Sequence, residues 1–490
     1  MKISELLKGL KYQMIEGEDV SAEGLCFDSR KCRPNDVFFA IPGFQTDGNR
    51  FIKDAFERGA VAAVVETVPQ ERLEGKTIIK VEGVRKALSR ASHHFYQKPS
   101  HGLKVIGVTG TNGKTSTVFF LKELLEKRGE KVGIIGTVGN FFADRVLKST
   151  HTTPESLEIH QLLHEMYHQG ASYVIMEVSS HGLSLSRVED VRFQGTLFTN
   201  LSQDHLDFHH TMEEYYQAKR KLFVDSNGWQ IMNTDDEYGR RLYREMKKEN
   251  KNIFALGKTG SEDFVLEIQE KKFHQTVFLF SHEKERTEFV TDLIGEFTVY
   301  NLSGAIAAAV CEGHALATLA QGVAGLKPVP GRLDAQLAKE GFKVIIDYAH
   351  TPDGLLNVLK ALEEEPHRKI ITVFGCGGDR DKGKRPKMGK IAQDKSDITF
   401  VTSDNPRTED EMAIIKDILE GMDGSDPNLH VVQNRYDAIK EAIHTAQKED
   451  VVLIAGKGHE TYQIFKDRVI DFDEKVIVKE ILEANEKDLH

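Results

Sequence analysis

Short runs of β-branched and other apolar residues alternate with amphipathic stretches through the middle and last parts of the chain, and most runs end at glycine or polar residues. Such runs predict buried parallel strands, and the stretches between them predict helices packed on the sheet in α/β layers. The expected strands are residues 104–109, 172–178, 195–201, 343–349, 369–375, 398–404 and 450–456, and a helix is expected at 116–129. Ligands bind at the carboxyl ends of the strands in such sheets, so the residues that follow each run are the first candidates for a site.

Two breaks rich in proline and glycine interrupt this rhythm, at residues 96–102 and 326–335. Proline and glycine disrupt both helical and strand periodicity, which indicates loops at these places. The breaks divide the chain into expected domains 1–98, 99–331 and 332–490, each of a size that suits a single domain. A length of 490 residues agrees with this number, at about 150 residues per domain.

Composition narrows the class of protein. The formal net charge of -11 argues against non-specific nucleic-acid binding, which needs a basic surface. No apolar run approaches the roughly 20 residues of a membrane span, and lysines and acids interrupt the N-terminal apolar residues too often for a signal peptide. A soluble, cytoplasmic protein without membrane insertion is expected. The four cysteines include no Cys-x-x-Cys pair, so neither a disulfide framework nor a thiolate zinc site is suggested.

The segment GVTGTNGKTSTV, residues 107–118, has the features of a phosphate-binding loop. Gly110 and Gly113 permit tight turns of positive φ, which lets consecutive backbone amides point at an anion. Lys114 would reach the outer phosphates, the Thr115 hydroxyl could bind Mg²⁺, and the helix N-terminus adds partial positive charge. The strict spacing of such loops would need a glycine where a valine stands, six residues before Lys114. We interpret the segment as a phosphate loop rather than an ordinary strand-to-helix turn, because strand, loop, lysine and helix follow in order.

Acidic and histidine residues follow the next two expected strands. Glu177 ends an apolar run, where an acid would hold Mg²⁺ directly or through water, or would simply be solvated. His205 and His209 are four residues apart and would share one face of a helix, as zinc ligands do. The spacing indicates no third zinc ligand, so a histidine near a Mg²⁺ site and a loop without catalytic role both fit better.

Later segments repeat the pattern of polar residues after apolar runs. Residues 214–223 predict an amphipathic helix whose lysines and arginine would form a solvated basic face. Residues 375–386 combine glycines and basic residues, which suits either an anionic ligand or a flexible loop. Asn405 before proline favours a turn, which does not explain the arginine at position 407. Further polar or glycine-rich strand ends occur at residues 347–354 and 455–462.

Eight motifs occur in a fixed order along the chain: TGTNGKT, EVSSHGL, DHLDFH, AKRKLF, DYAHTPD, GGDRDKGKRP, DNPR and AGKGHE. Together they resemble the Mur ligases of peptidoglycan synthesis, from about residue 20 to the C-terminus. The family builds its phosphate loop around TGTNGKT rather than around the strict spacing. The resemblance implies an α/β protein of three domains, with an N-terminal mixed α/β UDP-binding domain, a central P-loop ATPase-like domain with a mainly parallel sheet, and a C-terminal Rossmann-like domain that binds the amino acid.

The resemblance also implies the reaction, which is ATP-driven amide formation through an acyl phosphate. The branch that this chain is similar to adds the third residue of the stem peptide to UDP-N-acetylmuramoyl-L-alanyl-D-glutamate, with ATP as co-substrate and Mg²⁺ as cofactor. The residues implied to be catalytic are Lys114, Glu177, His205 and Lys219. Those implied to bind the metal are Thr115, Glu177, His205 and Lys219, the last as a carbamate (N6-carboxylysine), which replaces the basic-face interpretation.

The resemblance assigns the remaining site residues to three ligands. ATP is expected at Gly110, Thr111, Asn112, Gly113, Lys114, Thr115, Ser116, Asn301, Arg332, Asp347 and His350. The UDP-sugar-peptide is expected at Ser29, Thr152, Thr153, Ser179 and Arg187, with the loop 43–48 near its uracil end. Relatives often carry a glutamine two residues before that arginine, but Leu185 stands here, so no polar contact is assigned to it.

The amino acid that is added follows from the DNPR motif, which resembles the version that selects meso-diaminopimelate over L-lysine. The two differ by a distal carboxylate, which an arginine can clamp with two parallel hydrogen bonds. The expected pocket consists of Arg380, Asp404, Asn405, Pro406, Arg407, Gly456 and Glu460, with Glu460 taking the distal ammonium. The alternatives are an L-lysine-adding ligase of the same family and, further away, another P-loop ATPase. The partners expected are these small molecules alone, bound by a monomer.

Overall fold

The structure is a computed structural model that describes residues 1–43, 46–70, 75–143, 145–147, 151–248, 252–272 and 275–488. Residues 44 and 45 of the loop expected near the uracil lie outside these ranges. The chain forms two compact units, each built from three segments. Unit 1 consists of Met1–Thr109, Arg128–Thr196 and Ala218–Gln230, and unit 2 consists of Gly110–Lys127, Leu197–Gln217 and Ile231–His490.

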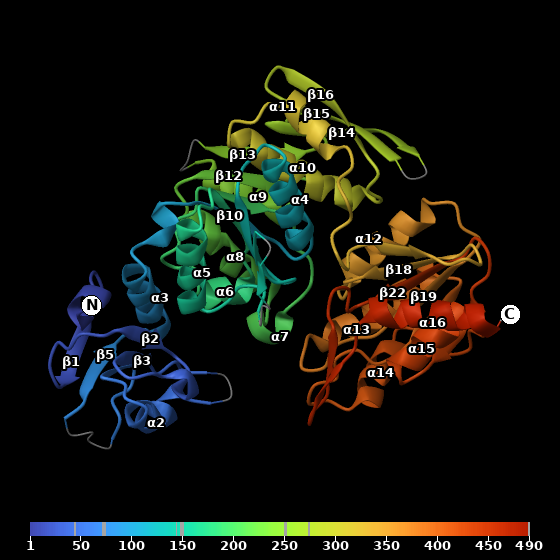
Figure 1. The fold of residues 1–490 in the computed structure, drawn as a ribbon. Coiled ribbons are helices and arrows are strands. Elements are labelled where there is room, and N and C mark those ends of the chain that lie inside the picture. Colours follow the sequence, from blue (N-terminus) through green and yellow to red (C-terminus); the bar gives the residue numbers. More distant parts are fainter. Residues whose placement is uncertain are drawn as a thin grey trace. The chain divides into compact units, whose positions relative to one another are not determined.

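Unit 1 begins with a five-stranded sheet of order β1-β5-β4-β3-β2 (Figure 1). Its strands are β1 (Tyr12–Glu16), β2 (Gly24–Cys26), β3 (Asp36–Phe39), β4 (Ala62–Val65) and β5 (Thr77–Val81), with β1 antiparallel to β5 and the others parallel. Apolar side chains point to both faces, so helices cover both. Helices α1 (Ile3–Leu6) and α3 (Val84–Phe95) pack on one face, and α2 (Ile52–Glu57) packs on the other. Three 3-10 turns complete this part: η1 (Ser29–Lys31), η2 (Gly48–Phe51) and η3 (Pro99–His101).

The rest of unit 1 centres on a fully buried strand, β10 (Tyr173–Glu177), which lies parallel between β6 (Lys104–Thr109) and β7 (Val132–Ile135). The register places Glu177 opposite Val108, so the acid lies at the carboxyl end of the strand, as predicted. The edge strands β8 (Asn140–Phe142) and β9 (Arg145–Leu147) and the helices α5 (Ser156–His168) and α6 (Ser180–Ser184) complete this part.

Unit 2 starts at the phosphate loop. Three elements have residues in both units: β11 (Gly195–Phe198), α8 (Met212–Val224) and β12 (Trp229–Asn233). The other elements before residue 330 are α4 (Lys114–Glu126), α7 (Leu206–His209), α9 (Glu237–Met246), β13 (Ile253–Gly257), β14 (Phe264–Lys272), β15 (Gln275–His282), β16 (Glu285–Thr291), α10 (Glu296–Cys311) and α11 (Leu316–Val323). Helix α10 is rich in alanine and almost entirely buried, and it packs along α4, the helix that the phosphate loop begins.

The C-terminal part of unit 2 is a three-layer sandwich around a sheet of order β17-β18-β22-β19-β20-β21 (Figure 1). All its strands are parallel except β17, and their bounds are β17 (Asp334–Leu337), β18 (Lys343–Asp347), β19 (Ile370–Phe374), β20 (Ile398–Val401), β21 (Leu429–Val431) and β22 (Val451–Ala455). One face packs on α12 (Pro352–Glu363), α13 (Arg385–Lys395) and α14 (Glu411–Leu419), and the other packs on α15 (Arg435–Thr445) and α16 (Glu474–Asp488). The turn η4 (Lys382–Lys384) and a hairpin of β23 (Tyr462–Ile464) and β24 (Val469–Asp471) complete it.

A buried arginine ties this domain together. Arg435, at the start of α15, donates a hydrogen bond of 2.7 Å to Glu474 at the start of α16. Its other nitrogens donate to the backbone carbonyls of Ser403 and Ala455, which lie at or just after the ends of β20 and β22. Both charged side chains are fully buried. Hydrogen bonds satisfy the guanidinium, whereas Oε2 of Glu474 has no hydrogen-bond partner among the described residues, so the buried pair is only partly compensated.

The architecture confirms the predicted fold class, since the three parts are mixed α/β, P-loop-like and Rossmann-like as expected. The seven predicted strands all exist, shortened by up to three residues at their ends. None of the helices in the described part of the chain combines the length and apolar character that crossing a bilayer requires.

Candidate active site

The phosphate loop has the geometry that its glycines predict. Gly113 has a φ of +85°, and a Cβ there would press against the Oδ1 atom of Asn301, so only glycine fits without strain. Lys114 begins α4 and folds its ammonium over the loop, where it donates to the carbonyls of Gly110 at 2.9 Å and Thr111 at 2.8 Å. The Thr111 hydroxyl in turn contacts the Tyr215 hydroxyl at 3.1 Å. The loop therefore carries its cation at the position where a helix N-terminus favours an anion.

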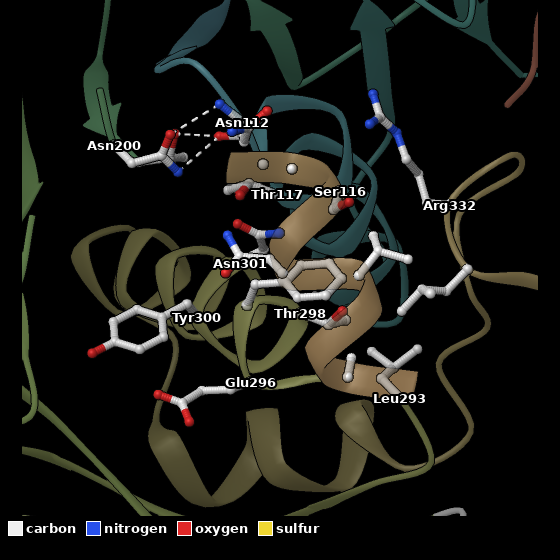
Figure 2. Close-up of a pocket in the computed structure, with 18 of the residues that line it drawn as sticks. Asn112, Ser116, Thr117, Asn200, Leu293, Glu296, Thr298, Tyr300, Asn301 and Arg332 are labelled. Carbon is white, nitrogen blue, oxygen red and sulfur yellow. Dashed lines mark hydrogen bonds between the residues drawn. The ribbon is translucent and has the colours of Figure 1, made fainter. Parts of the chain in front are cut away.

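A cavity of about 570 Å³ opens beside this loop within unit 2. Figure 2 shows Asn112 and Asn200 joined by hydrogen bonds on one side of it and Arg332 on another, with Asn301 and Thr298 between them. The predicted ATP residues that line it are Asn112, Gly113, Ser116, Asn301, Arg332 and Asp347. Apolar walls and a few convergent polar groups in a cavity of this size are typical of a small-molecule site.

The apolar part of the lining comes from residues that the sequence did not single out. Leu293, Ile294, Phe297, Val329 and Leu333 form it, and Tyr300 and Glu296 add polar atoms at its rim. These side chains lie on or near α10 and on the segment before β17. A flat, apolar ring such as a nucleobase would cover these apolar side chains and exclude water from them. The phosphate loop lies at the polar end of the same cavity.

Arg332 and Asp347 also line the cavity. The Arg332 guanidinium donates to the Thr115 hydroxyl at 3.2 Å and stacks 4.5 Å from the centre of the Tyr348 ring. Asp347, at the end of β18, accepts from the backbone amides of Leu333 and Ala349. Burial raises the pKa of Asp347, although Arg332 and the two amides oppose the shift.

Asp204 is a buried acid at the centre of a positive cluster that the sequence did not predict. Its carboxylate lies 3.1 Å from the ammonium of Lys384, 3.3 Å from His205 Nε2 and 3.7 Å from His350 Nε2. Burial alone would raise the pKa of Asp204, but Lys384 and then His205 and His350 outweigh burial and hold the pKa well below its usual range. Two predicted site residues, His205 and His350, thus share one carboxylate. His205 precedes α7 with a φ of +56°, so it does not share a helical face with His209, and the zinc interpretation loses its basis.

Glu177 is the centre of a second polar cluster, in unit 1. Its two carboxylate oxygens accept from the backbone amide of Thr137 at 2.9 Å and from its hydroxyl at 3.0 Å. The Thr137 and Thr152 hydroxyls also lie within hydrogen-bond distance of each other, at 3.0 Å, and the Thr153 hydroxyl donates to the Glu177 carbonyl. The predicted acid is therefore buried among the residues predicted for the UDP-sugar-peptide, and the solvated-acid interpretation is wrong.

The other residues predicted for that substrate extend the cluster around Glu177. Arg187 donates to the Thr153 carbonyl at 2.8 Å and pairs with Glu155 at 2.8 Å. Ser179 caps α6 by accepting from the Gly182 amide, and its own amide donates to Thr153. Ser29 is apart from them, at the start of η1 in the N-terminal sheet domain, where it is buried.

Lys219 lies on α8, within the helix predicted at 214–223, but it is 1% exposed. The solvated basic face suggested by composition is therefore wrong for this residue. Burying an ammonium group is costly, so a buried lysine needs either compensating charge or a chemical change.

The residues predicted for the added amino acid gather at the carboxyl ends of β20 and β22. Arg407 has a φ of +53°, an uncommon conformation that is held by hydrogen bonds from its amide to Ile464 and from its side chain to the Gly378 carbonyl. Burial, and then its neighbour Arg380, lower the pKa of Arg407. The partly buried Arg407 and the exposed Arg380 repel each other, and two neighbouring guanidinium groups of this kind attract a carboxylate.

Beside these arginines lies a network around Lys457, another residue that the sequence did not single out. Its fully buried ammonium donates to Asn405 at 3.1 Å and Glu460 at 3.2 Å, and it lies 3.7 Å from Asp404. Burial would raise the pKa of Asp404, but Lys457, Arg435 and Arg407 lower it. Gly456 has a φ of +122°, and a side chain there would meet the Asp404 carboxylate. A lysine inside a glycine-rich strand end gives no pattern that distinguishes it from an exposed one, which is why it was missed.

Three family models match successive parts of the chain. The Mur ligase family catalytic domain matches residues 21–96, the Mur ligase middle domain matches 108–309, and the Mur ligase glutamate ligase domain matches 331–458. Together they cover most of the chain, and Glu460 of the Lys457 network lies just beyond the last matched range.

Individual relatives match over the full length. The UDP-N-acetylmuramoyl-L-alanyl-D-glutamate--2,6-diaminopimelate ligase of Clostridium tetani is 44% identical over 99% of both chains, and that of Caldanaerobacter subterraneus is 42% identical over 99% of this chain and 100% of its own. A solved structure of a ligase of the same name has a TM-score of 0.68 at 31% identity, with 99% of each chain covered. The MurF ligase of Thermotoga maritima in complex with ADP, at 19% identity, covers 96% of this chain and 100% of its own with a TM-score of 0.67, and it shares the fold. The resemblance carried by the eight motifs is thereby confirmed, and this chain belongs to the Mur ligase family.

Proposed function

We infer that this chain is an ATP-dependent amide ligase that adds meso-diaminopimelate to the D-glutamate γ-carboxylate of UDP-N-acetylmuramoyl-L-alanyl-D-glutamate, a step of peptidoglycan precursor synthesis. The observation that carries this inference is full-length identity of 42–44% with several ligases of that name. The DNPR motif and the paired guanidinium groups of Arg380 and Arg407 support diaminopimelate as the amino acid.

The cavity beside the phosphate loop is proposed as the ATP site. Its apolar end would take the adenine, with Asn301 near the base, and its loop end would take the phosphates. Arg332, Asp347 and His350 would contact the ribose and phosphates. Lys114 would exchange its two loop carbonyls for phosphate oxygens, and the first-turn amides of α4 would hold the same anion.

Mg²⁺ is proposed as the cofactor, with ligands assigned by motif: Thr115, Glu177, His205 and Lys219 as its carbamate. Hydroxyl, carboxylate, carbamate and imidazole groups are mainly hard oxygen donors, which suit Mg²⁺. When bound, the ion would neutralise charge on the phosphates that meet the substrate carboxylate. The burial of Lys219 is compatible with the carbamate, because the bound metal ion would compensate the negative charge of a buried carbamate.

The reaction has two steps. An oxygen of the D-glutamate γ-carboxylate attacks the γ-phosphorus of ATP. The bond between this phosphorus and the oxygen that bridges it to the β-phosphorus breaks, so ADP is released and the carboxylate becomes an acyl phosphate. The amine of diaminopimelate then attacks the acyl carbon, loses a proton, and displaces inorganic phosphate. Positive groups such as Lys114 lower the repulsion between the two anions in the first step.

The pocket around Arg407 is proposed to select the acceptor amine. Arg407 and Arg380 would bind the distal carboxylate, which L-lysine lacks, and Glu460 would bind the distal ammonium. Asp404, Asn405, Pro406 and Gly456 would shape the pocket. The UDP-sugar-peptide is proposed to bind Ser29, Thr152, Thr153, Ser179 and Arg187. The proposed domains are residues 1–98, 99–331 and 332–490.

Phosphate release by the purified protein tests the proposal, with ATP, Mg²⁺ and the UDP-sugar dipeptide present and either meso-diaminopimelate or L-lysine added. Turnover with diaminopimelate, and a product of the corresponding mass, is expected. A preference for lysine would retain the ligase and reject the role of Arg407. ATP turnover without the UDP-sugar would instead indicate another kind of P-loop ATPase.

A further inference from the structure

Two cysteines and an aspartate meet in the N-terminal sheet domain, and none of the three is among the residues assigned to catalysis above. The two sulfur atoms and a carboxylate oxygen of Cys26, Cys32 and Asp36 all lie within 4.8 Å of one another, and the three residues are buried. We propose that these three side chains form a binding site for one Zn²⁺ ion. This contrasts with the expectation from the sequence, in which no Cys-x-x-Cys spacing indicated a thiolate site.

The fold brings these residues together through two neighbouring strands and the turn between them. Cys26 ends β2, Asp36 begins the parallel neighbour β3, and Cys32 follows η1. The register pairs Gly24 with Asp36, and a side chain on Gly24 would collide with the Asp36 carboxylate. Glycine at position 24 therefore makes room for the carboxylate beside Cys26, which is two residues further on the same face.

The distances suit a tetrahedral ion. Zinc lies about 2.3 Å from a cysteine sulfur and about 2.0–2.2 Å from a carboxylate oxygen, which sets two sulfurs on one ion about 3.8 Å apart. The cluster needs to contract by no more than about 1 Å to reach this arrangement. Three protein ligands leave one position of the tetrahedron for a water molecule or another group.

The chemistry of the cluster selects zinc over magnesium. Soft thiolates favour Zn²⁺, whereas Mg²⁺ prefers oxygen ligands, so this site would not compete for the metal of the ATP reaction. The interaction between the two neighbouring thiols raises the pKa of Cys26 and lowers that of Cys32. Binding of a divalent cation to thiolates releases their protons.

The surrounding charges are compatible with a cation bound by three anionic ligands. Two thiolates, one carboxylate and Zn²⁺ carry a net single negative charge. Arg58 favours the thiolate of Cys32, and Arg33 favours the carboxylate of Asp36. Burial nevertheless raises the pKa of Asp36, and the negative charges of Asp36 and Asp28 raise the pKa of Cys26. The plainer interpretation is that both cysteines are small apolar groups in the core with Phe38 and Ile52. Under it, the Asp36 carboxylate serves only to accept the Arg33 backbone amide at 2.8 Å, and its approach to the two sulfur atoms has no role.

Cobalt substitution of the full-length protein tests the site. After removal of metal by a chelator and of the chelator by gel filtration, Co²⁺ titration of the reduced protein should give a thiolate charge-transfer band that saturates at one ion per chain. Zn²⁺ should abolish the band. Cys26→Ser and Cys32→Ser should each remove much of its intensity, and Asp36→Asn should weaken binding by about tenfold or more. Cys311→Ser and Cys376→Ser are matched controls that should leave it unchanged.

Alkylation of the wild-type protein gives a second test that needs no variant to fold. Zn²⁺ should protect Cys26 and Cys32 from a maleimide reagent and leave Cys311 equally reactive, as read from peptide masses. A missing charge-transfer band, a band that survives both cysteine variants, or alkylation indifferent to Zn²⁺ would overturn the proposal in favour of plain core packing. Formation of a Cys26–Cys32 disulfide that excludes metal, under the same reducing conditions, would also overturn it. None of these measurements depends on ligase activity.

Discussion

The side-chain amide of Asn405 donates a hydrogen bond of 2.8 Å to Oε2 of Glu460. The same oxygen accepts from the buried ammonium of Lys457, which also donates to the Asn405 side chain, so the three side chains close a ring. The ring fixes the direction of the Glu460 carboxylate before any amino acid arrives. A group oriented in advance loses little entropy on binding, which favours selective recognition.

Substitution of Lys457 by methionine should destabilise the C-terminal domain strongly. It would leave Asp404 and Glu460 without their buried countercharge, and breaking a buried pair in this way costs about 3–5 kcal/mol. Chemical denaturation followed by circular dichroism measures the free energy of unfolding. Lys466→Met, a change at an exposed lysine nearby, is the control that should have little effect. If Lys457→Met and Lys466→Met unfolded at the same denaturant concentration, the ring of three side chains would not contribute to the free energy of unfolding.

Substitution of Arg407 by lysine should raise the KM for diaminopimelate by about 10- to 100-fold and change kcat less. Lysine keeps the charge but loses the two parallel hydrogen bonds to a carboxylate, each charge-assisted bond being worth about 1.5–3 kcal/mol. Initial rates of phosphate release at varied diaminopimelate give both constants. Arg468→Lys, at an exposed arginine, is the control. An unchanged KM would remove Arg407 from the pocket.

Substitution of Gly113 by alanine should weaken ATP binding by about tenfold or more. The left-handed backbone costs an alanine about 1–2 kcal/mol, and the new methyl group would also press on Asn301. Gly129→Ala is a close control, since Gly129 has a φ of +86° but nothing within 4 Å of the added carbon. Calorimetric titration with ATP should show normal affinity in Gly129→Ala, although both variants lose stability. Equal affinity in the two would contradict the placement of ATP.

The stability of unit 1 should fall in mild acid because of two buried histidines. Burial lowers the pKa of His160 to about 3 and that of His93 to about 4, and both ring nitrogens of His160 lack a hydrogen-bond partner among the described residues. Below pH about 6.5 the histidines bind protons in the unfolded chain but stay neutral in the folded chain. Their contribution to the free energy of unfolding is therefore fully present above that pH and decreases as the pH falls toward the pKa of the folded state. Each histidine contributes a slope of about 1.4 kcal/mol per pH unit within that window.

Unfolding midpoints of the wild type and of His160→Leu, measured between pH 4 and pH 7 (chosen to span most of the window from about 6.5 downward), check this expectation. The variant should show a shallower pH dependence, whereas His444→Leu, at an exposed histidine on α15, should follow the wild type. Parallel curves for all three proteins would mean that His160 is not what titrates.

Substitution of Lys219 by arginine should abolish carbamate formation and reduce activity by at least about 100-fold, because arginine keeps a positive charge where the proposed metal ligand is an anion. A carbamate signal in the ¹³C NMR spectrum of protein equilibrated with labelled bicarbonate reports the modification directly. The signal should be present in the wild type and in Lys221→Arg, and missing in Lys219→Arg. A signal that persists in Lys219→Arg would place the modification elsewhere.

The sequence predicted most of what is local. Apolar runs located the central strands, and the glycines of the phosphate loop predicted its turn, because both depend on residues adjacent in the chain. Composition predicted a solvated Lys219 since its neighbours are basic, and only the motif resemblance indicated otherwise. The structure then placed this lysine in the interior.

Contacts between distant segments could not be predicted in the same way. Thr137 is 40 residues from the Glu177 it binds, and Lys384 is 180 residues from Asp204. Thr137 has no distinctive neighbourhood in the sequence, and the motif around Lys384 does not indicate which acid this lysine pairs with. The spacing of Cys26 and Cys32 in the sequence matches no known metal-binding motif, and only the pairing of β2 with β3 brings Asp36 close to them.

The buried bond between Arg435 and Glu474 has a consequence for how this family varies. Arg435 also donates to the carbonyls of Ser403 and Ala455, next to the DNPR and AGKGHE segments, so the C-terminal helix is anchored to the segments that carry the proposed amino-acid pocket. Loss of either charge strands the other in the interior, which makes single replacements at the two positions costly. Substitutions at positions 435 and 474 should therefore occur together among related chains, and the sequence of α16 should vary together with that of the proposed pocket rather than independently of it.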